Sequence, residues 1–255
     1  MNKYIEQIPK WWTEEGEYDL CLSDDIDSLM SCYYLSLYKK WNIKYFYDFY
    51  KTYKSKDYTG DKLIGVDMDI LKGRCLGNHV VYNDNENCIN LNRFAGIGFT
   101  NYTKKFAGNS IITVLSLLNI SADNFTQEQL EILLAIDTMF KSYYFDKDIA
   151  KYYISDVLGY PQLIHILEKH TQEYFYRIMD EYSLYSDIKC KDGYLHTNIK
   201  LKELKKIFNI RLELPKQEFF VCQEFKQGKG IPINNTNLFS FARTYRNSGI
   251  YSYYI

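Results

Sequence analysis

Short apolar runs alternate with amphipathic stretches along the first part of the chain. Residues 18–22 end in a continuous apolar run, which predicts a short buried strand. Over 28–41 the apolar residues recur at helical spacing and form one broad face, so a helix is expected there. Residues 43–49, rich in aromatic side chains, predict a second strand, and residues 62–67 predict a third. Strands and a helix in this order, joined by short connections, favour a parallel sheet.

The middle of the chain is predicted to be helical. A helix is expected over 110–118, where an apolar run follows Asn and Ser capping residues. Thr126 and Gln129 have the spacing of a capping box, which predicts a helix that continues beyond Asp137. Two further helices are expected over 147–157 and 161–183, the second with a proline in its first turn.

The last part of the chain changes character, because a short helix over 200–208 stands among strand-like pieces such as 211–214 and 219–222. The predicted fold class is therefore α/β. It consists of a parallel-sheet N-terminal domain with flanking helices (1–160), a connecting helix (161–184) and a smaller α+β domain that binds substrate (185–255).

Composition narrows the classes of function. The 255 residues carry a net charge of −1, so no overall field attracts nucleic acid or an anionic membrane. The six cysteines lack zinc-ligand spacing, and the N-terminus lacks a signal-peptide pattern, which predicts a cytoplasmic protein and no membrane partner. The high content of Tyr, Lys, Ile and Asn is typical of an AT-rich genome, such as that of a low-GC bacterium or a phage.

Three carboxylates follow the first predicted strand directly. Asp25 and Asp27 flank a single residue, so one tight turn can aim both at the same point beyond the strand end, where open α/β sheets bind ligands. Adjacent anions repel unless a cation or protons neutralise them, and a hard divalent metal ion is the first candidate. The alternative is that Asp24 or Asp25 only caps the following helix.

Three further positions carry side chains that can bind a metal ion. Asp67, with Asp69 nearby, ends the third predicted strand, although Asp in this context also closes turns. His79 lies between apolar residues, where a hydrogen-bonded core histidine is the alternative. Asp137 stands among apolar helical residues and needs a partner there.

The order of these motifs resembles that of the DHH phosphoesterases. Residues 25–31 (Asp-Ile-Asp-Ser-Leu-Met-Ser) are similar to the first family motif, and 65–67 (Gly-Val-Asp) are similar to the second. Residues 78–80 (Asn-His-Val) stand where the Asp-His-His triplet would be, followed by Asn-Leu-Asn at 90–92. The helix start at Asn109-Ser110 and the segment 134–140, with its Asp-Thr pair, complete a resemblance that covers residues 18–145.

The resemblance implies an N-terminal α/β domain that holds two manganese ions, a linker helix and a small substrate domain. It also implies hydrolysis of phosphodiester or phosphoanhydride bonds in single-stranded DNA, short oligonucleotides, cyclic dinucleotides or pyrophosphate. One or two Mn²⁺ (or Mg²⁺) ions would lower the pKa of a water molecule and stabilise charge on phosphorus. The implied metal ligands and catalytic residues are Asp25, Asp27, Asp67, His79 and Asp137.

Basic residues near the C-terminus supply candidate phosphate contacts, with ordinary surface pairing as the alternative. They are Lys229 in a Gly-Lys-Gly sequence, Arg243 and Arg246. Aromatic and basic residues also interleave over 44–56, where they form a base-stacking platform or bury half of the rings in a strand. The expected partner is a nucleotide or single-stranded nucleic acid, and the sequence does not specify the oligomeric state.

Departures from the family pattern keep other functions open. Ser23 stands where the family has His or Asp, and the Asp-His-His triplet is reduced to one imidazole at His79. One alternative is a catalytically inactive DHH-like module that binds a nucleotide or a protein and is encoded by a phage or mobile element. Another is a phosphatase or phosphotransfer domain with Asp25 as nucleophile, although a matching lysine motif is missing.

Overall fold

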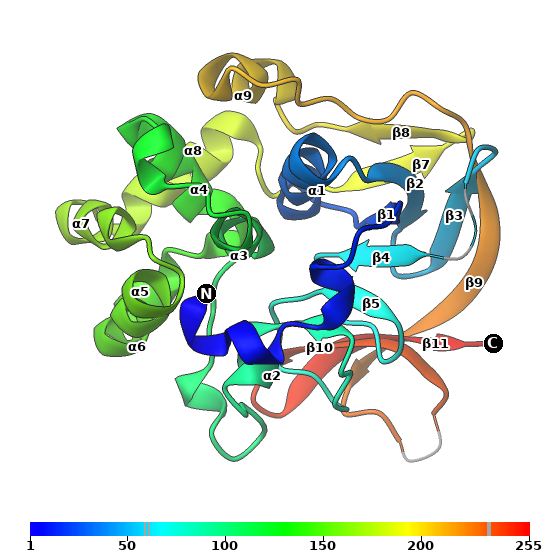
Figure 1. Cartoon of the computed structure of the whole chain (residues 1–255), viewed down its shortest axis with the longest axis horizontal. Helices are drawn as coiled ribbons and strands as arrows, with labels where there is room; N and C mark the ends of the chain where they lie inside the picture. Colours follow the sequence, from blue (N-terminus) through cyan, green and yellow to red (C-terminus); the bar gives the residue numbers. More distant parts are fainter. Residues whose placement is uncertain (59, 61, 234–235) are drawn as a thin grey trace.

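A curled sheet forms the centre of the computed structural model, which describes residues 1–58, 60, 62–233 and 236–255. Within these residues nine strands form one sheet in the order β10-β11-β9-β3-β2-β1-β4-β5-β6, and two more form a separate hairpin (Figure 1). The sheet strands are β1 (Asp19–Leu22), β2 (Asn42–Tyr47), β3 (Lys51–Ser55), β4 (Leu63–Val66), β5 (Arg74–Leu76), β6 (Cys88–Ile89), β9 (Phe219–Gly230), β10 (Leu238–Tyr245) and β11 (Ser248–Tyr254), and the hairpin strands are β7 (Ile188–Lys191) and β8 (Tyr194–Thr197).

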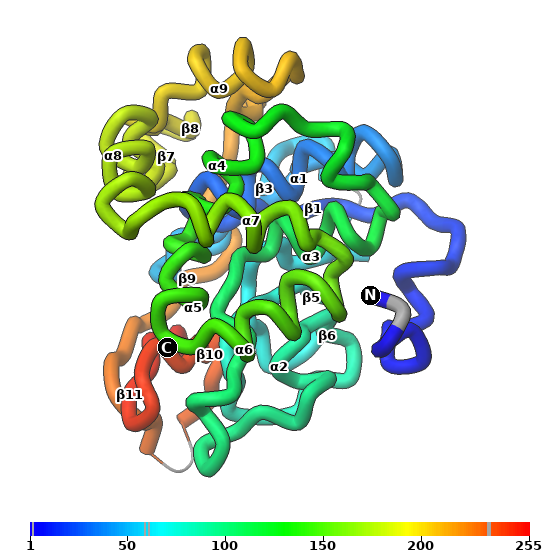
Figure 2. The backbone as a smooth tube through the Cα atoms, turned by 90° about the vertical axis from the view of Figure 1, so that its left-hand side faces the viewer, coloured from blue at the N-terminus to red at the C-terminus, as the bar shows by residue number. Residues whose placement is uncertain are grey.

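Most of the helices gather on one side of the sheet, and Figure 2 shows this helical layer in front of it. The α-helices are α1 (Ile26–Lys39), α2 (Leu91–Phe94), α3 (Ser110–Leu117), α4 (Gln127–Ala135), α5 (Lys141–Phe145), α6 (Lys147–Lys151), α7 (Pro161–Lys169), α8 (Gln172–Tyr182) and α9 (Leu201–Phe208). Short 3-10 helices include η1 (Asn2–Gln7), η2 (Lys10–Trp12), η3 (Tyr102–Lys104), η4 (Ala122–Asn124) and η5 (Ile136–Thr138), and a π-helical turn (η6, Tyr152–Val157) follows α6.

The predicted α/β class and the parallel N-terminal strands are confirmed. Strand β1 pairs in parallel with β2 on one side and β4 on the other, and β5 and β6 continue the parallel part. The capping box of Thr126 and Gln129 is also present at the start of α4. Because neighbouring parallel strands end at the same edge, the residues that follow β1 and β4 meet there.

Strands β9–β11 extend the same sheet instead of forming a second one. β9 pairs antiparallel with β3, so the segment predicted as a separate domain over 185–255 contributes three strands to the central sheet. The sheet then curls until β10 reaches the residues after β4 and β5, through bridges between Ile70 and Ser240 and between Val80 and Arg243. The domain boundary was predicted from local composition, which carries no information about pairing across such a distance in sequence.

Two apolar cores flank the sheet, and successive strand residues point into them alternately. Leu20 and Phe46 belong to the larger core under the helices. Cys21 and Tyr47 belong to the smaller core inside the curl. The Tyr47 hydroxyl contacts the Ser240 and Ser252 hydroxyls, each at 2.7 Å, which ties β2 to β10 and β11.

Three local predictions were wrong, and one strand was missed. The helix from 127 ends at Ala135 rather than continuing past Asp137, because η5 interrupts it. The connecting helix over 161–184 is two helices, α7 and α8. No strand was predicted over 51–55, which form β3, and the strand-like piece 211–214 is not a strand. None of the helices in the described part of the chain combines the length and apolar composition of a membrane span.

Candidate functional site

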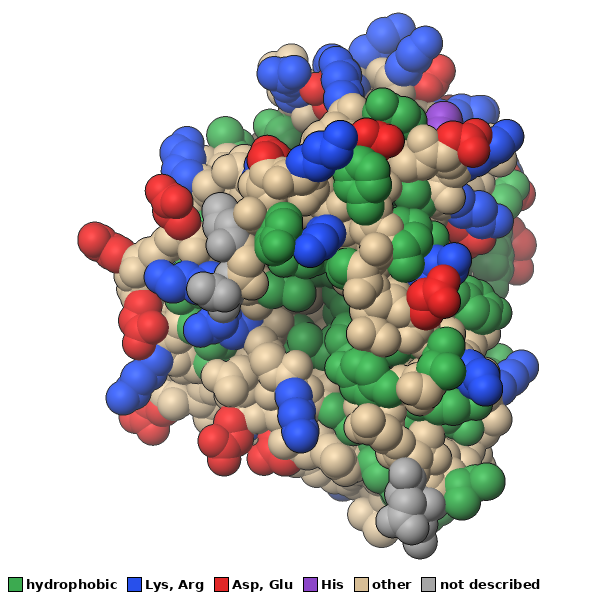
Figure 3. All heavy atoms as spheres, turned by 90° about the vertical axis from the view of Figure 1, so that its right-hand side faces the viewer, with side chains coloured by type: hydrophobic (Ala, Val, Ile, Leu, Met, Phe, Trp, Pro, Cys, Tyr) green, Lys and Arg blue, Asp and Glu red, His purple; other side chains and the backbone are tan. Residues whose placement is uncertain are grey.

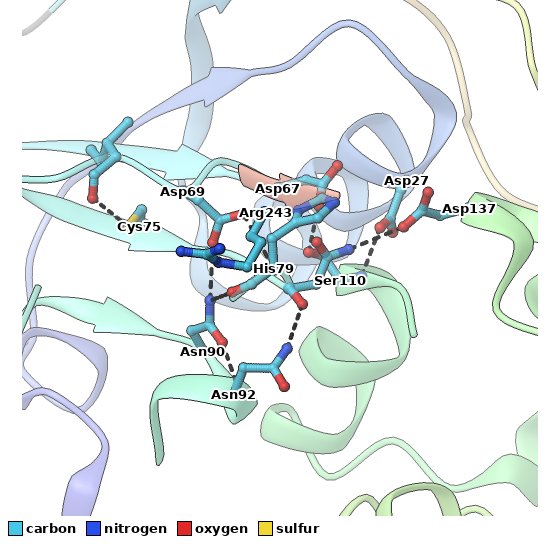
Figure 4. Close-up of polar contacts among 12 residues, drawn as sticks. Asp27, Asp67, Asp69, Cys75, His79, Asn90, Asn92, Ser110, Asp137 and Arg243 are labelled. Carbon is cyan, nitrogen blue, oxygen red and sulfur yellow. Dashed lines mark hydrogen bonds and ion pairs between the residues drawn. The ribbon is translucent and has the colours of Figure 1, made fainter. Parts of the chain in front are cut away.

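The carboxylates that follow β1 and β4 meet at the predicted edge of the sheet (Figure 4). Asp25 caps α1, because its Oδ1 accepts the backbone N–H of Ser28 at 2.9 Å, so the capping alternative is correct as far as it goes. Asp25 also lies close enough to Asp67 for the two carboxyl groups to hydrogen-bond. Asp25 therefore both caps α1 and belongs to the carboxylate cluster.

Asp27 is fixed by the start of α3. Its carboxylate is completely buried and accepts the backbone N–H groups of Ser110 at 2.6 Å and Ile111 at 2.7 Å. These donors are unpaired within their own helix, and the helix dipole favours a negative group there. The Ser110 hydroxyl donates in addition to Asp67 at 2.7 Å, so one helix end holds two of the carboxylates.

Strained backbone positions turn two of the carboxylates toward the cluster. Asp67 has φ 56°, Asp137 has φ 50°, and Thr138 has φ 53°, which is the left-handed region that side-chain-bearing residues rarely adopt. Thr138 is β-branched, so its strain is the least easily tolerated of the three. Strain of this kind persists where the surrounding structure enforces it, and it concentrates at functional sites.

Burial, followed by mutual repulsion, determines the pKa values of the carboxyls in the cluster. Burial and the charges of Asp27 and Asp25 raise the pKa of Asp67 well above its ordinary value. Burial and the charges of Asp25 and Asp137 do the same to the pKa of Asp27, despite its two backbone hydrogen bonds. Burial also raises the pKa of Asp25.

The pKa values of two further carboxyls at the margin of the cluster, Asp137 and Asp24, are also raised. Burial raises the pKa of Asp137 to about 6, although the charge of His79 opposes this. Burial and the charge of Asp25 raise the pKa of Asp24 to about 7. Five carboxyl groups are therefore concentrated at one place in the fold, and their surroundings favour the protonated form of each.

His79 is held by Asp69 rather than buried as an isolated core histidine. The Asp69 Oδ2 lies 2.9 Å from the His79 Nδ1 and also accepts its backbone N–H. Burial alone would lower the pKa of His79, but the hydrogen bond and charge of Asp69 outweigh it, and the pKa is raised. Asp69 is thus the hydrogen-bond partner of the imidazole. The other ring nitrogen, Nε2, stays available on a side chain that is 33% exposed.

A glycine makes room for this pair. A Cβ atom on Gly77 would collide with the Asp69 carboxylate, so only glycine fits at this position without displacing it. Asn90 completes the arrangement, because its amide donates to the Asp69 Oδ1 at 2.9 Å and to the His79 carbonyl at 2.8 Å. Asn90 also caps α2.

Asn78 links the His79 segment to Asp137. Its Nδ2 donates to the Asp137 Oδ2 at 3.2 Å, and its buried Oδ1 has no hydrogen-bond partner among the described residues. Asn92 holds the same segment, since its amide donates to the Asn78 carbonyl at 2.8 Å and to the Phe106 carbonyl at 2.9 Å. An amide therefore stands where the resemblance implies an anionic ligand.

A pocket of about 700 Å³ opens beside the cluster. His79 and Asp137 lie in its wall, together with residues of the 102–108 segment, α5 and the turn after β10. Volumes of this size are typical of small-molecule and cofactor sites. The cluster thus has access to a ligand-sized space rather than only to the protein interior.

Of the three predicted substrate-binding residues, one lines the pocket and two do not. Arg246 lines the pocket. Arg243 is buried, and its Nη1 donates to the Arg246 carbonyl at 2.7 Å, so it supports the turn that carries Arg246. Lys229 lies exposed on β9, paired with β11, and does not line the pocket. Of the two interpretations of 44–56, the burial of rings in a strand is confirmed, because Tyr45 and Phe46 lie in the two cores.

The donor set fits a hard divalent cation in its chemistry, since carboxylate oxygens and one imidazole nitrogen are ligands of Mn²⁺ and Mg²⁺. The geometry is not that of an assembled metal site: among the described residues, no three His, Cys, Asp or Glu side chains already surround one ion position. Backbone N–H groups occupy both oxygens of Asp27, and Asp25 and Asp67 contact each other. Binding an ion would separate that pair.

Sequence reasoning missed several residues that build the site. Ser110 was expected only to begin a helix, whereas its N–H and hydroxyl bind two carboxylates. Asn78 and Gly77 carried no motif beyond their place next to His79. Lys105 and Lys141, which line the pocket, are ordinary lysines in the sequence. No local signal marks such residues, because their roles depend on contacts between distant segments.

Comparison of the chain with protein-family models, with curated proteins and with solved structures gives no match.

Proposed function

We propose that this protein is a metal-dependent phosphoesterase that hydrolyses a phosphodiester or phosphoanhydride bond in a nucleotide or a short single-stranded nucleic acid. The observation that carries the proposal is the convergence of Asp25, Asp27, Asp67 and Asp137 beside His79 at the wall of a pocket. Mutual repulsion among these carboxyls is relieved when a cation binds. The motif order that resembles the DHH phosphoesterases supports the same function.

One or two Mn²⁺ or Mg²⁺ ions bound by Asp25, Asp27, Asp67, His79 and Asp137 would supply an activated water molecule and positive charge at phosphorus. The protein contributes orientation. The start of α3 fixes Asp27, and Asp69 holds the His79 ring with Nε2 directed away from it. With Nδ1–H donated to Asp69, Nε2 carries no hydrogen, and its lone pair would be available to an ion.

One side of the molecule, away from the pocket, does not favour a nucleic-acid duplex. Figure 3 shows basic and acidic side chains intermixed on the side of β3 and β9, with no continuous basic stripe. Two lysines of that face pair with carboxylates, Lys51 with Glu224 at 3.0 Å and Lys56 with Glu218 at 3.6 Å. The six cysteines, none of them in a disulfide, support a reducing compartment such as the cytoplasm.

The test is hydrolysis of bis-p-nitrophenyl phosphate with and without Mn²⁺, preceded by elemental analysis of the purified protein. We expect manganese-dependent release of nitrophenol that Asp137→Asn reduces by about a hundredfold or more, since removal of such a group typically costs a factor of this size. The Asp137 residue as a whole is exposed in its turn, although its carboxyl group faces Asn78 and the cluster, so the variant is expected to fold. Asp180→Asn, on the exposed side of α8, is the matched control and should retain full activity.

The absence of an assembled ion position among the described residues favours a second candidate, a catalytically inactive module that binds a nucleotide or a protein. Asn78 in place of an anionic ligand points the same way. Wild-type protein that binds no Mn²⁺ and releases no nitrophenol would leave this candidate in place of the enzyme.

A further inference from the structure

Three cations line the pocket beside the carboxylate cluster, and they come from separate parts of the chain. Lys105 follows η3, Lys141 begins α5, and Arg246 lies in the turn between β10 and β11. None of the three forms an ion pair with a carboxylate in the part of the chain that the structure describes. Other basic residues do, for example Lys44 with Asp57 and Arg93 with Asp84. The pocket therefore has positive charge available for a ligand.

A chain of hydrogen bonds links Lys105 to Arg246, so these two cations belong to one wall of the pocket. Lys105 Nζ donates to the Tyr102 hydroxyl at 2.9 Å, and that hydroxyl donates to the Arg243 carbonyl at 3.1 Å. Arg243 in turn donates to the Arg246 carbonyl at 2.7 Å. The backbone N–H of Arg243 also donates to the Val80 carbonyl at 3.1 Å, directly after His79. The wall is thus fixed relative to the catalytic imidazole.

Exposed aromatic rings stand at the same pocket. Phe145 is 73% exposed and Tyr245 is 70% exposed, and both line it. Large aromatic side chains exposed at the wall of a pocket are suited to stacking on a planar group of a ligand, such as a nucleobase. Cations and rings together specify a ligand that carries both an anionic and a planar aromatic part.

We propose that Lys105, Lys141 and Arg246 bind a second, non-reacting phosphate of a nucleotide substrate, while Phe145 and Tyr245 contact its base. This inference rests on the proposed function, which places the reacting phosphate at the carboxylate cluster. It predicts a preference for a short oligonucleotide with a terminal phosphate over the same molecule without one. Lys105 is the cation within electrostatic reach of both His79 and Asp137, so the two phosphates lie in one continuous pocket.

The test compares the dithymidylate pTpT with unphosphorylated TpT by calorimetry in EDTA, where no metal-dependent turnover occurs. We expect pTpT to bind about tenfold more tightly, as a charge-assisted hydrogen bond or two would provide. Lys105→Gln, Lys141→Gln and Arg246→Gln should each reduce this preference severalfold. Phe145→Ala should weaken both ligands by about the same factor, since it removes a contact to the base rather than to the phosphate.

Lys206→Gln, an exposed lysine on α9, is the matched control and should keep the preference. Equal binding of pTpT and TpT, or an equal loss in the Lys206 control, would overturn the inference. Hydrolysis of the two ligands in Mn²⁺ separates this result from the proposed function. Tighter binding of pTpT without hydrolysis of either ligand would support the phosphate-binding role of the three cations and contradict the proposed phosphoesterase function. Hydrolysis with equal binding of the two ligands would contradict the phosphate-binding role and support the phosphoesterase function.

Discussion

Two regions of this protein bury carboxylates in opposite ways. Glu131 on α4 is 6% exposed, and three donors surround it: the Tyr174 hydroxyl at 2.6 Å, the Gln127 amide at 2.7 Å and the His170 Nε2 at 3.4 Å. The cluster around Asp67 instead places carboxylates against each other. A buried carboxylate with hydrogen-bond donors around it stabilises the packing of helices. A group of buried carboxyls that repel one another lowers stability, and such groups are typical of functional sites.

The largest effect is expected from Glu131→Ala, which leaves three donors without an acceptor. We expect this variant to lose about 3 kcal/mol of unfolding free energy, because a buried side chain and its hydrogen bonds to the half-buried Tyr174 and His170 are lost. Asp67→Asn should instead raise the unfolding free energy, because it removes a repelling charge and asparagine tolerates the left-handed backbone at this position. Urea denaturation in EDTA measures both. Equal losses in the two variants would contradict the comparison.

Divalent cations should stabilise the protein through the carboxylate cluster. Mn²⁺ at a hundred times its dissociation constant would raise the unfolding free energy of the wild type by about 2.7 kcal/mol, since it binds the folded state alone. Asp67→Asn should lose most of this gain, so that the order of stability of wild type and variant reverses between EDTA and Mn²⁺. Thermal unfolding at several Mn²⁺ concentrations measures it, and an unchanged midpoint in the wild type would refute the metal site.

A smaller effect is expected from pH in EDTA. The folded-state pKa values of Asp137, about 6, and Asp24, about 7, lie above the ordinary 3.8, so the folded protein retains protons that the unfolded chain releases. The contribution of these two groups to the unfolding free energy is therefore greatest below pH 4 and decreases as the pH rises toward 7. Urea titrations between pH 4 and pH 7.5 test this. Asp137→Asn should flatten the profile, and Asp180→Asn should leave it unchanged.

The smallest predicted effect concerns Gly77. A methyl group there displaces the Asp69 carboxylate and frees the His79 ring, which should weaken Mn²⁺ binding by about tenfold, as loss of an outer-shell partner does. The nitrogen NMR shifts of His79 should change at the same time, because its ring loses the Asp69 hydrogen bond. Gly98→Ala, at a position open to solvent, is the control. Unchanged His79 shifts in Gly77→Ala would contradict the positioning role of Asp69.

Local sequence patterns were sufficient for the parallel half of the sheet and for the residues at its edge. β1, α1, β2 and β4 follow from apolar spacing, and Asp25, Asp27 and Asp67 follow from their places directly after strands. The turn at Asp137 could not be predicted, because residues 136–138 contain no glycine or proline and the kink is imposed by packing. Tertiary contacts override local propensity in such cases.

Long-range pairing accounts for the rest. Lys51–Ser55 has no apolar period and becomes a strand only because β2 and β9 pair with it on both sides. The pocket combines residues near positions 79, 105, 141 and 246, and no local pattern joins them. The carboxylates and Arg246 could therefore be found from the sequence, whereas Lys105 and Lys141 could not.

The pairing order of the last strands constrains when this pocket can exist during synthesis. β11 lies between β9 and β10 in the sheet, so β10 has no place beside β9 until residues 248–254 are available. A ribosome-bound chain that has exposed only the first two hundred residues can form β1, β4 and the Asp cluster, but not the turn that carries Arg246. We therefore expect the carboxylates, Lys105 and Lys141 to be available early in translation, whereas Arg246 joins the pocket only after the last strands have been made.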